Sequence, residues 1–278
     1  MLNVGQGNCC VWTSPQADIV IDANIPSSGN GTYVKGYLQN KALVRSPISL
    51  FMLTGWDCDH ANAAGVGMVV NNFTVSTVWI PPWPNTTEAA KEVKRILKED
   101  ARWAKGYDVY HPRTDQQRCF QIGDTKITVF SPHPEDADTS NNTSIVAKLE
   151  CGGFSVLITG DCEQSRWSSI VRYFGKELSS DVLVAPHHGS RNGITEEALQ
   201  KIRPKLVLIS AGNHSTWQHP HQEAVDLYKK YVGDYIFVTK EHGNIKTYRD
   251  VGGVIKYVCD NQVKVQDSLI SLLAKPLL

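Results

Sequence analysis

The sequence has 278 residues, of which 41% are hydrophobic, and its 28 Lys and Arg balance its 28 Asp and Glu. A chain of this length and composition can bury one large core or two small ones. The even balance provides no global field to attract nucleic acid or an anionic membrane. This argues mildly against a dedicated DNA-binding protein, but leaves open a nuclease whose metal ion supplies the positive charge locally.

The cysteines and the N-terminal residues indicate the compartment. Seven cysteines are scattered without any CxxC pair, so neither a zinc ribbon nor a disulfide framework is indicated. Free thiols suit a reducing compartment. The first residues have no basic segment followed by an apolar core, and no stretch reaches the about 18 apolar residues of a membrane span. We therefore expect a soluble, cytoplasmic protein that makes no membrane contact.

The first half of the chain predicts strands and helices in alternation. Apolar or alternating runs bounded by turn residues predict strands, and longer periodic segments predict helices. The helix at 88–106 carries Lys and Arg at intervals of three to four residues, which gives it one basic face. That face is either an ordinary solvated surface or a track for a phosphate backbone. The expected strands are 9–13, 19–21, 48–53 and 75–80, and the other expected helices are 29–40 and 61–71.

The second half repeats this style, and the two halves together predict one α/β (α+β) domain. A domain over 1–260 would form a two-sheet sandwich covered outside by helices, and 261–278 would be a tail or a packing helix. The expected strands are 119–122, 126–130, 144–150, 154–159, 182–186, 206–210, 235–238, 243–248 and 253–258, with helices at 164–174, 195–202 and 221–231.

The segment FMLTGWDCDHANAAG at 51–65 carries the first functional signal. An apolar strand stops at Thr-Gly and is followed by Asp57, Asp59 and His60 within four residues. Carboxylate and imidazole groups on a tight loop are a common way to hold Zn²⁺ or Mn²⁺. Considered alone, the two aspartates could equally be turn or N-cap residues. The small residues that follow would let a helix start close to the loop.

Three more apolar strands end in side chains that can bind a metal ion. The strand at 19–21 leads to Asp22, the strand at 156–159 leads to Asp161, and the strand at 182–186 leads to His187 and His188. A single aspartate at a strand end is usually a cap or a turn residue, whereas adjacent histidines on a loop have few packing uses. Four such strand ends in one chain indicate one metal site at a shared sheet edge.

These segments resemble the metallo-β-lactamase fold, and within it the ComEC-type branch of hydrolase domains. The resemblance extends from residue 1 to about 258. The similar motifs occur in family order and are LNVGQGN at 2–8, IDAN at 21–24, DCDH at 57–60, NNTSIV at 141–146, LITGDCE at 157–163, APHHGS at 185–190 and HPH at 219–221.

The resemblance implies an αββα sandwich of two mixed β-sheets flanked by helices, with a metal site along the edge between the sheets. One metal position would use Asp59, His60, Asp161 and His187, with Asp161 bridging to the other position. Asp57 would be a ligand of that other position, and Asn141 stands where related branches have a histidine. Asp22 would orient the loop. His188 and His219 would line the pocket.

One departure from the family pattern concerns the residue two before Asp57, which is a histidine in the family and Gly55 here. Glycine offers no donor atom, and Asn141 is a poor ligand. We therefore predict one firm metal position and a second that is weak or absent. His214 or His133 could supply a replacement imidazole, although each also fits an ordinary surface loop. Asn8 stands where the family has an aspartate.

The resemblance implies a metal-dependent hydrolase, and oxygen-rich ligands favour a phosphodiester, so we expect a phosphodiesterase or nuclease that uses a metal-activated water. Asp59 would hold the metal at the reaction centre, and His188 or His219 would assist the leaving group. The substrate would be nucleic acid or another phosphodiester; the sequence names no protein partner. The alternative is a sensor or partner-binding module that binds a metal or nucleotide without turnover. Hydrolysis of a lactone, thioester or β-lactam is a weaker third reading. Trp56, Trp83 and Trp217 either pack or stack a base.

Overall fold

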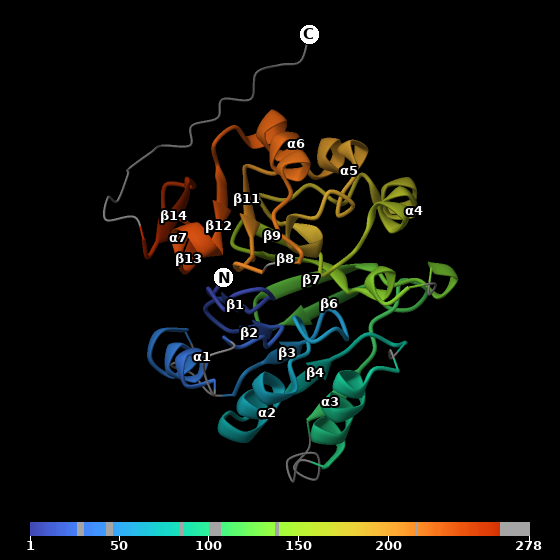
Figure 1. Cartoon of the computed structure of the whole chain (residues 1–278), viewed down its shortest axis with the longest axis vertical. Helices are drawn as coiled ribbons and strands as arrows, with labels where there is room; N and C mark the ends of the chain where they lie inside the picture. Colours follow the sequence, from blue (N-terminus) through green and yellow to red (C-terminus); the bar gives the residue numbers. More distant parts are fainter. Residues whose placement is uncertain are drawn as a thin grey trace.

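Two β-sheets face each other, and each is covered on its outer side by helices (Figure 1). The computed structural model describes residues 1–26, 31–42, 47–83, 86–99, 107–136, 139–214 and 216–261. The expected C-terminal tail lies outside these residues from position 262 onward. Within the described ranges, no helix has both the length and the apolar character that crossing a membrane requires.

The first sheet has five strands in the order β1-β2-β3-β4-β5. The first two strands form an antiparallel hairpin, and the others continue the sheet in parallel. The strands are β1 (Cys10–Thr13), β2 (Asp18–Ile21), β3 (Leu50–Met52), β4 (Thr77–Trp79) and β5 (Asp108–Tyr110). The adjoining helices are α1 (Thr32–Tyr37), continued by a π-helical turn at Leu38–Ala42, α2 (Ala63–Asn72) and α3 (Glu88–Glu99).

The second sheet has seven strands in the order β12-β11-β10-β9-β8-β7-β6. Its strands are β6 (Cys119–Ile122), β7 (Thr125–Ser131), β8 (Val146–Cys151), β9 (Phe154–Ile158), β10 (Val182–Val184), β11 (Leu206–Ile209) and β12 (Ile236–Val238). The remaining elements are α4 (Gln164–Phe174), α5 (Glu196–Ile202), α6 (Gln222–Val232), α7 (Thr239–His242) and the hairpin of β13 (Ile245–Arg249) and β14 (Ile255–Cys259).

Side chains on the two faces of each sheet belong to different cores, as the alternation of a strand requires. In β2 and β3, Val20 and Phe51 pack in the core that includes α2 and α3, while Ile19 and Leu50 pack against the other sheet. A third core joins the second sheet to α4, α5 and α6. The sheets are mixed, and the layers are helix, sheet, sheet, helix, which confirms the predicted αββα sandwich.

Most of the expected elements are present, and α4 has the expected bounds. The short strand β5 and the single turn α7 were missed. The helix expected at 88–106 is observed as α3 up to Glu99, and the rest of that range lies outside the described residues.

Candidate metal centre

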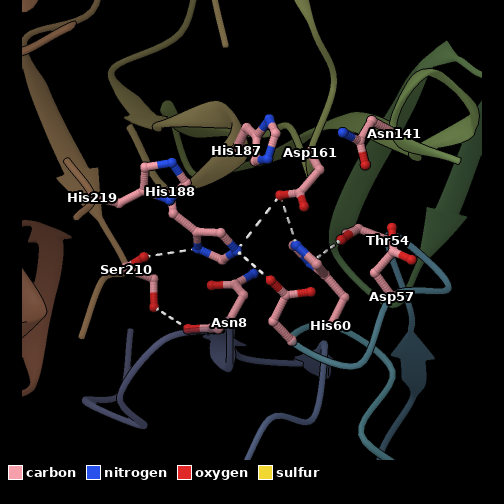
Figure 2. Close-up of polar contacts among 12 residues, drawn as sticks. Asn8, Thr54, Asp57, His60, Asn141, Asp161, His187, His188, Ser210 and His219 are labelled. Atoms are coloured by element: carbon pink, nitrogen blue, oxygen red, sulfur yellow. Dashed lines mark hydrogen bonds and ion pairs between the residues drawn. The ribbon is translucent and has the colours of Figure 1, made fainter. Parts of the chain in front are cut away.

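Four side chains at the edge between the sheets form a group that could hold a metal ion. Asp59, His60, Asp161 and His188 each offer a ligand atom, and these atoms lie within 4.8 Å of one another (Figure 2). Asp59 and His60 follow β3 of the first sheet, whereas Asp161 and His188 follow β9 and β10 of the second. Among the residues described, this is the one group of three or more such side chains.

The His60 imidazole is held so that one nitrogen faces the group. Its Nδ1 lies 2.8 Å from Asp22 Oδ2, and its Nε2 lies 2.8 Å from Asp161 Oδ1. A carboxylate only accepts hydrogen bonds, so Nδ1 carries a hydrogen atom. The Nε2 atom is then left to hold a second proton or to bind a cation.

The His188 imidazole repeats this arrangement from the other sheet. Its Nδ1 donates to the Ser210 carbonyl oxygen at 2.8 Å. Its Nε2 is buried without a hydrogen bond, 3.4 Å from Asp59 Oδ2 and 3.6 Å from Asp161 Oδ1. Two carboxylates face this buried nitrogen at those distances, and two imidazoles with two carboxylates form a set that suits Zn²⁺ or Mn²⁺.

The pKa shifts show how strongly charge is concentrated in this group. Burial alone would raise the pKa of Asp161, but the adjacent His60 and His188 outweigh it and hold that pKa well below its ordinary value. Burial alone would lower the pKa of either imidazole, but Asp161 and, for His60, Asp22 raise it instead. Protons thus stabilise the carboxylates when no cation is bound, and a metal ion would compete with these protons.

Asp22 lies behind His60 and contacts its Nδ1, and the orienting role that the family resemblance implies for it remains a prediction. Its buried carboxylate accepts hydrogen bonds from the Thr54 amide at 2.6 Å, the Thr54 hydroxyl at 2.7 Å and the Asn8 side-chain amide at 2.8 Å, in addition to His60. This carboxylate–histidine arrangement fixes the imidazole tautomer and ring orientation needed for metal binding.

The segment 141–146 couples the two loops that carry the ligands. The Ile145 amide donates to the Thr54 carbonyl oxygen at 2.8 Å, and the Asp161 amide donates to Ser144 Oγ at 3.1 Å. Gly160 has φ +51°, and a Cβ at this position would lie 2.9 Å from Ser144 Cβ. This close approach explains why a glycine precedes Asp161.

The small residues after His60 allow α2 to begin against the loop, as expected. Asn62 caps the helix by accepting a hydrogen bond from the Gly65 amide at 3.0 Å. A Cβ at Gly65 would lie 1.7 Å from the Ala23 carbonyl oxygen. The helix therefore reaches the strand end of Asp22 only because residue 65 is a glycine.

The structure groups a different histidine with the carboxylates from the one that the resemblance implied. His188, expected in the pocket, belongs to the group of four, whereas His187, expected as a ligand, lies outside it, with its Nδ1 buried without a hydrogen bond and 3.4 Å from Glu163 Oε1. Both residues have left-handed backbone angles, with φ near +50°, and Ser210 holds the His188 ring inward. A tight turn and a carbonyl 22 residues away thus decide which imidazole faces the carboxylates.

Asp57 and Asn141 lie beside the group of four without joining it. Asp57 Oδ2 accepts a hydrogen bond from Ser140 Oγ at 3.0 Å, and the Asn141 amide donates to Glu163 Oε1 at 3.1 Å. A Cβ at Gly55 would lie 3.6 Å from the His60 ring, which is an ordinary contact, so there is room for a Cβ atom at this position. The prediction of one firm metal position and one weak or absent position remains a prediction.

His219 lies next to the group and has a defined tautomer. The Gly212 amide donates to Gln6 Oε1 at 3.3 Å, which leaves Gln6 Nε2 to donate to His219 Nδ1 at 3.3 Å. Its Nε2 therefore carries the hydrogen atom of the neutral ring. Burial, together with His188 and His187, lowers the pKa of His219 to about 4.

Neither candidate replacement imidazole joins the group. His133 Nδ1 accepts from the Glu135 amide at 3.2 Å, and His214 Nδ1 accepts from the Thr216 amide at 3.3 Å. Gln6, Ser210 and Glu163 were not singled out from the sequence. Ser210 follows the apolar strand β11, so the strand-end pattern that revealed the ligands could also have revealed it.

The basic helix and two of the three tryptophans have structural explanations. On α3, Lys91 pairs with Glu88 at 2.6 Å, and Arg95 pairs with Glu92. These ion pairs fit the solvated-face alternative. Trp56 is buried, and the Arg113 guanidinium lies 5.7 Å from the Trp83 ring centre.

Comparison with known proteins identifies the fold to which this architecture belongs. No family model matches the sequence. Among solved structures, Zn²⁺-bound PqqB from Methylobacterium extorquens superposes with a TM-score of 0.52 at 13% identity, covering 84% of this chain and 85% of that one. The chain has the metallo-β-lactamase fold.

Within that fold the chain is of the ComEC type. It is 34% identical over 217 residues to ComE operon protein 3 of Bacillus subtilis, and 26% identical over 233 residues to Recombination protein 2 of Haemophilus influenzae. These alignments cover 78% and 83% of this chain but only 25% and 26% of the relatives. The chain thus spans about a quarter of the length of the curated relatives it matches.

Proposed function

We propose that this chain is a metal-dependent phosphodiesterase or nuclease that hydrolyses its substrate with a metal-activated water. The observation that carries the proposal is the group of Asp59, His60, Asp161 and His188, in which the buried His188 Nε2 makes no hydrogen bond and faces the two carboxylates. Both imidazoles have Nδ1 committed to an acceptor, and both present Nε2 to Asp161. Such a group fits a cation better than it fits a purely structural hydrogen-bond network.

The two nitrogen and two oxygen ligands suit Zn²⁺ or Mn²⁺. A divalent cation bound there would acidify water and offset negative charge on a phosphoryl group. The chain's own residues prepare the site for this role. Asp22 and Ser210 keep both imidazoles in the tautomer that leaves Nε2 available, and the burial of His60, Asp161 and His188 excludes bulk water from their lone pairs.

Hydrolysis of a phosphodiester forms one P–O bond to the water oxygen, breaks one P–O ester bond and passes a proton from that water to the departing alkoxide. His188 was an expected proton donor, but its Nε2 is directed at the carboxylates. His219 is the remaining candidate. With a pKa of about 4 it is neutral near pH 7, so its role is to donate an Nε2–H hydrogen bond to a phosphoryl or leaving oxygen.

The test is hydrolysis of bis(p-nitrophenyl) phosphate by the purified chain with Mn²⁺ or Zn²⁺, compared with Asp161→Asn. Asp181→Asn is the matched control, because that carboxylate accepts bonds from the Ser155 amide and hydroxyl, far along the sheet from the site. Activity in the wild type and the control, but not in Asp161→Asn, supports the proposal. Equal rates in all three proteins, or none in any of them, refute it.

A second candidate function is a module that binds a metal ion or nucleotide without turnover. Gly55 favours it, because the described residues supply one cation group where a family member with a histidine there would have more ligands. Metal content separates the two candidates in part. One tightly bound ion without hydrolysis supports the module, whereas two ions per chain favour the enzyme.

A further inference from the structure

Trp217 is the most exposed tryptophan among the residues described, and it lies beside the candidate metal centre. It is 56% exposed, whereas Trp12, Trp56, Trp79 and Trp167 are all buried. Its ring lies 6.5 Å from that of His219 with an interplanar angle of 24°. The His219 ring in turn lies 6.2 Å from that of His188 at 25°. Three rings, each inclined by about 25° to the next, thus lead from a candidate ligand to solvent, and we call them the column of rings.

The loop around Trp217 holds the ring in this position. The His214 ring lies 6.3 Å from the indole at 26°, and His214 Nδ1 accepts a hydrogen bond from the Trp217 amide at 3.4 Å. The Gln218 amide donates to the His214 carbonyl oxygen at 3.2 Å. At the other end of the column, Gln6 fixes His219 by its Nδ1. The indole is therefore supported by its neighbours while more than half of its surface remains open.

A single exposed aromatic side chain is common on protein surfaces and needs no ligand to explain it. Here the position of the ring is informative, because it extends a stack of rings that begins at the metal group. Aromatic rings that border a backbone-binding site serve as platforms for unpaired bases, since every base has a π-face. We propose that Trp217 stacks with an unpaired nucleobase next to the phosphate held at the metal centre, so that the site acts on single-stranded nucleic acid.

This inference rests on the proposed function, and a nearby cation agrees with it. Lys240 Nζ donates to the His219 carbonyl oxygen at 2.7 Å, which places an ammonium group beside the column of rings. No carboxylate among the described side chains lies within ion-pair distance of Lys240. Its charge is therefore available to a phosphate that follows the base on Trp217.

A duplex cannot use the platform in the same way, because each of its bases is already stacked within the helix. An unpaired base gains a new stacking surface, which corresponds to about 5- to 150-fold in affinity per base. The protein should therefore discriminate between oligothymidylate and the same sequence paired with its complement. An abasic oligonucleotide of equal length keeps the phosphates and removes the stacking partner.

The experiment compares wild type, Trp217→Ala and Trp217→Phe, with Tyr173→Ala as a control of another exposed aromatic residue on α4 (63% exposed). Anisotropy of labelled oligothymidylate with hydrolysis-resistant phosphorothioate linkages measures binding independently of turnover, in the presence of Mn²⁺. The expected result is a 5- to 150-fold weaker Kd, or higher KM, for Trp217→Ala, about that expected for one base. Trp217→Phe should recover most of the affinity, and Tyr173→Ala should be unchanged.

The abasic oligonucleotide and the duplex should be affected less than twofold by any of these substitutions. Equal losses of affinity for oligothymidylate and for the abasic oligonucleotide would overturn the proposal, because they would indicate a structural role. Unchanged binding of oligothymidylate by Trp217→Ala would overturn it as well. If no protein hydrolyses any phosphodiester, the proposed function fails, but the binding comparison still decides whether Trp217 stacks with a base.

Discussion

Replacing Asp22 with asparagine should weaken metal binding without any change in the candidate ligands themselves. The substitution keeps the shape of the side chain and tolerates the left-handed backbone of this residue, φ +57°. It replaces an oxygen that accepts from His60, Asn8 and the Thr54 hydroxyl with an amide nitrogen that donates. The Thr54 hydroxyl can rotate and accept, but Asn8 still presents a donor. His60 can relieve the conflict only by moving its proton to Nε2.

Two effects of different size follow from this geometry. Once His60 has moved its proton, one buried donor, the Asn8 amide, has lost its acceptor at a cost of about 1 to 3 kcal/mol, so the free energy of unfolding of the metal-free protein should fall by about that amount. The proton on His60 Nε2 removes the lone pair that faces Asp161. Loss of such an orienting carboxylate typically lowers metal affinity by about 10- to 100-fold.

Titration calorimetry with Zn²⁺ or Mn²⁺, under competition with a chelator, measures the affinity, and urea unfolding measures the stability. Asp181→Asn is the control, since it also removes an acceptor, in this case from the Ser155 amide and hydroxyl, but away from the candidate centre. It should reduce stability and leave the affinity unchanged. Wild-type metal affinity in a folded Asp22→Asn variant would refute the orienting role.

Four further outcomes follow from the structure. His188→Ala should lower metal affinity at least 10-fold and His187→Ala less than about threefold; calorimetry showing the reverse would favour the assignment made from the sequence. Gly55→His should raise the metal content, measured by elemental analysis, towards two ions per chain. The control Gly55→Ala adds only a Cβ, 3.6 Å from a His60 ring atom, and its metal content should stay at one ion per chain. In α2, Gly65→Ala should lower the free energy of unfolding by more than about 3 kcal/mol in urea, because its Cβ would lie 1.7 Å from a carbonyl oxygen. Gly67→Ala has its nearest contact at 3.8 Å and should raise the free energy of unfolding by up to about 1 kcal/mol. The pKa values of His60 and His188 lie above the ordinary 6.5, so the ion pairs of the protonated imidazoles are complete below about pH 6.5 and are lost as the pH rises through the raised values. Chelator-treated protein should therefore have a lower free energy of unfolding at about pH 8 than at about pH 6, whereas metal affinity should rise over the same range. A stability and a metal affinity that do not change with pH would contradict this.

The strand ends of the site were predictable because they depend on local sequence. An apolar run followed by a carboxylate or an imidazole identified Asp22, Asp59, His60 and Asp161, and the parallel strands that precede them bring their carboxyl ends to one edge. The sandwich followed from the same runs, since both faces of the central strands β2, β3 and β10 are buried. Local patterns suffice where one strand determines where one side chain lies.

Other features depend on contacts between distant segments, which no local pattern contains. The choice between His187 and His188 rests on two left-handed residues and on the Ser210 carbonyl oxygen. The three tryptophans near the site looked alike in the sequence, yet Trp56 is buried and Trp217 is exposed. Strand β5 is three residues long and pairs only with β4 at the edge of its sheet, which leaves little periodicity to detect.

The candidate centre takes two ligands from each sheet, and this division links metal binding to folding. Asp59 and His60 extend from the first sheet, and Asp161 and His188 extend from the second. A cation held by all four would connect the sheets at their shared edge and would stabilise the folded chain by about 2.7 kcal/mol at a concentration 100 times its Kd. A histidine in place of Gly55 would add a ligand on the first sheet alone. The connection between the sheets does not depend on that position, so a glycine at residue 55 is compatible with a stable, metal-binding fold.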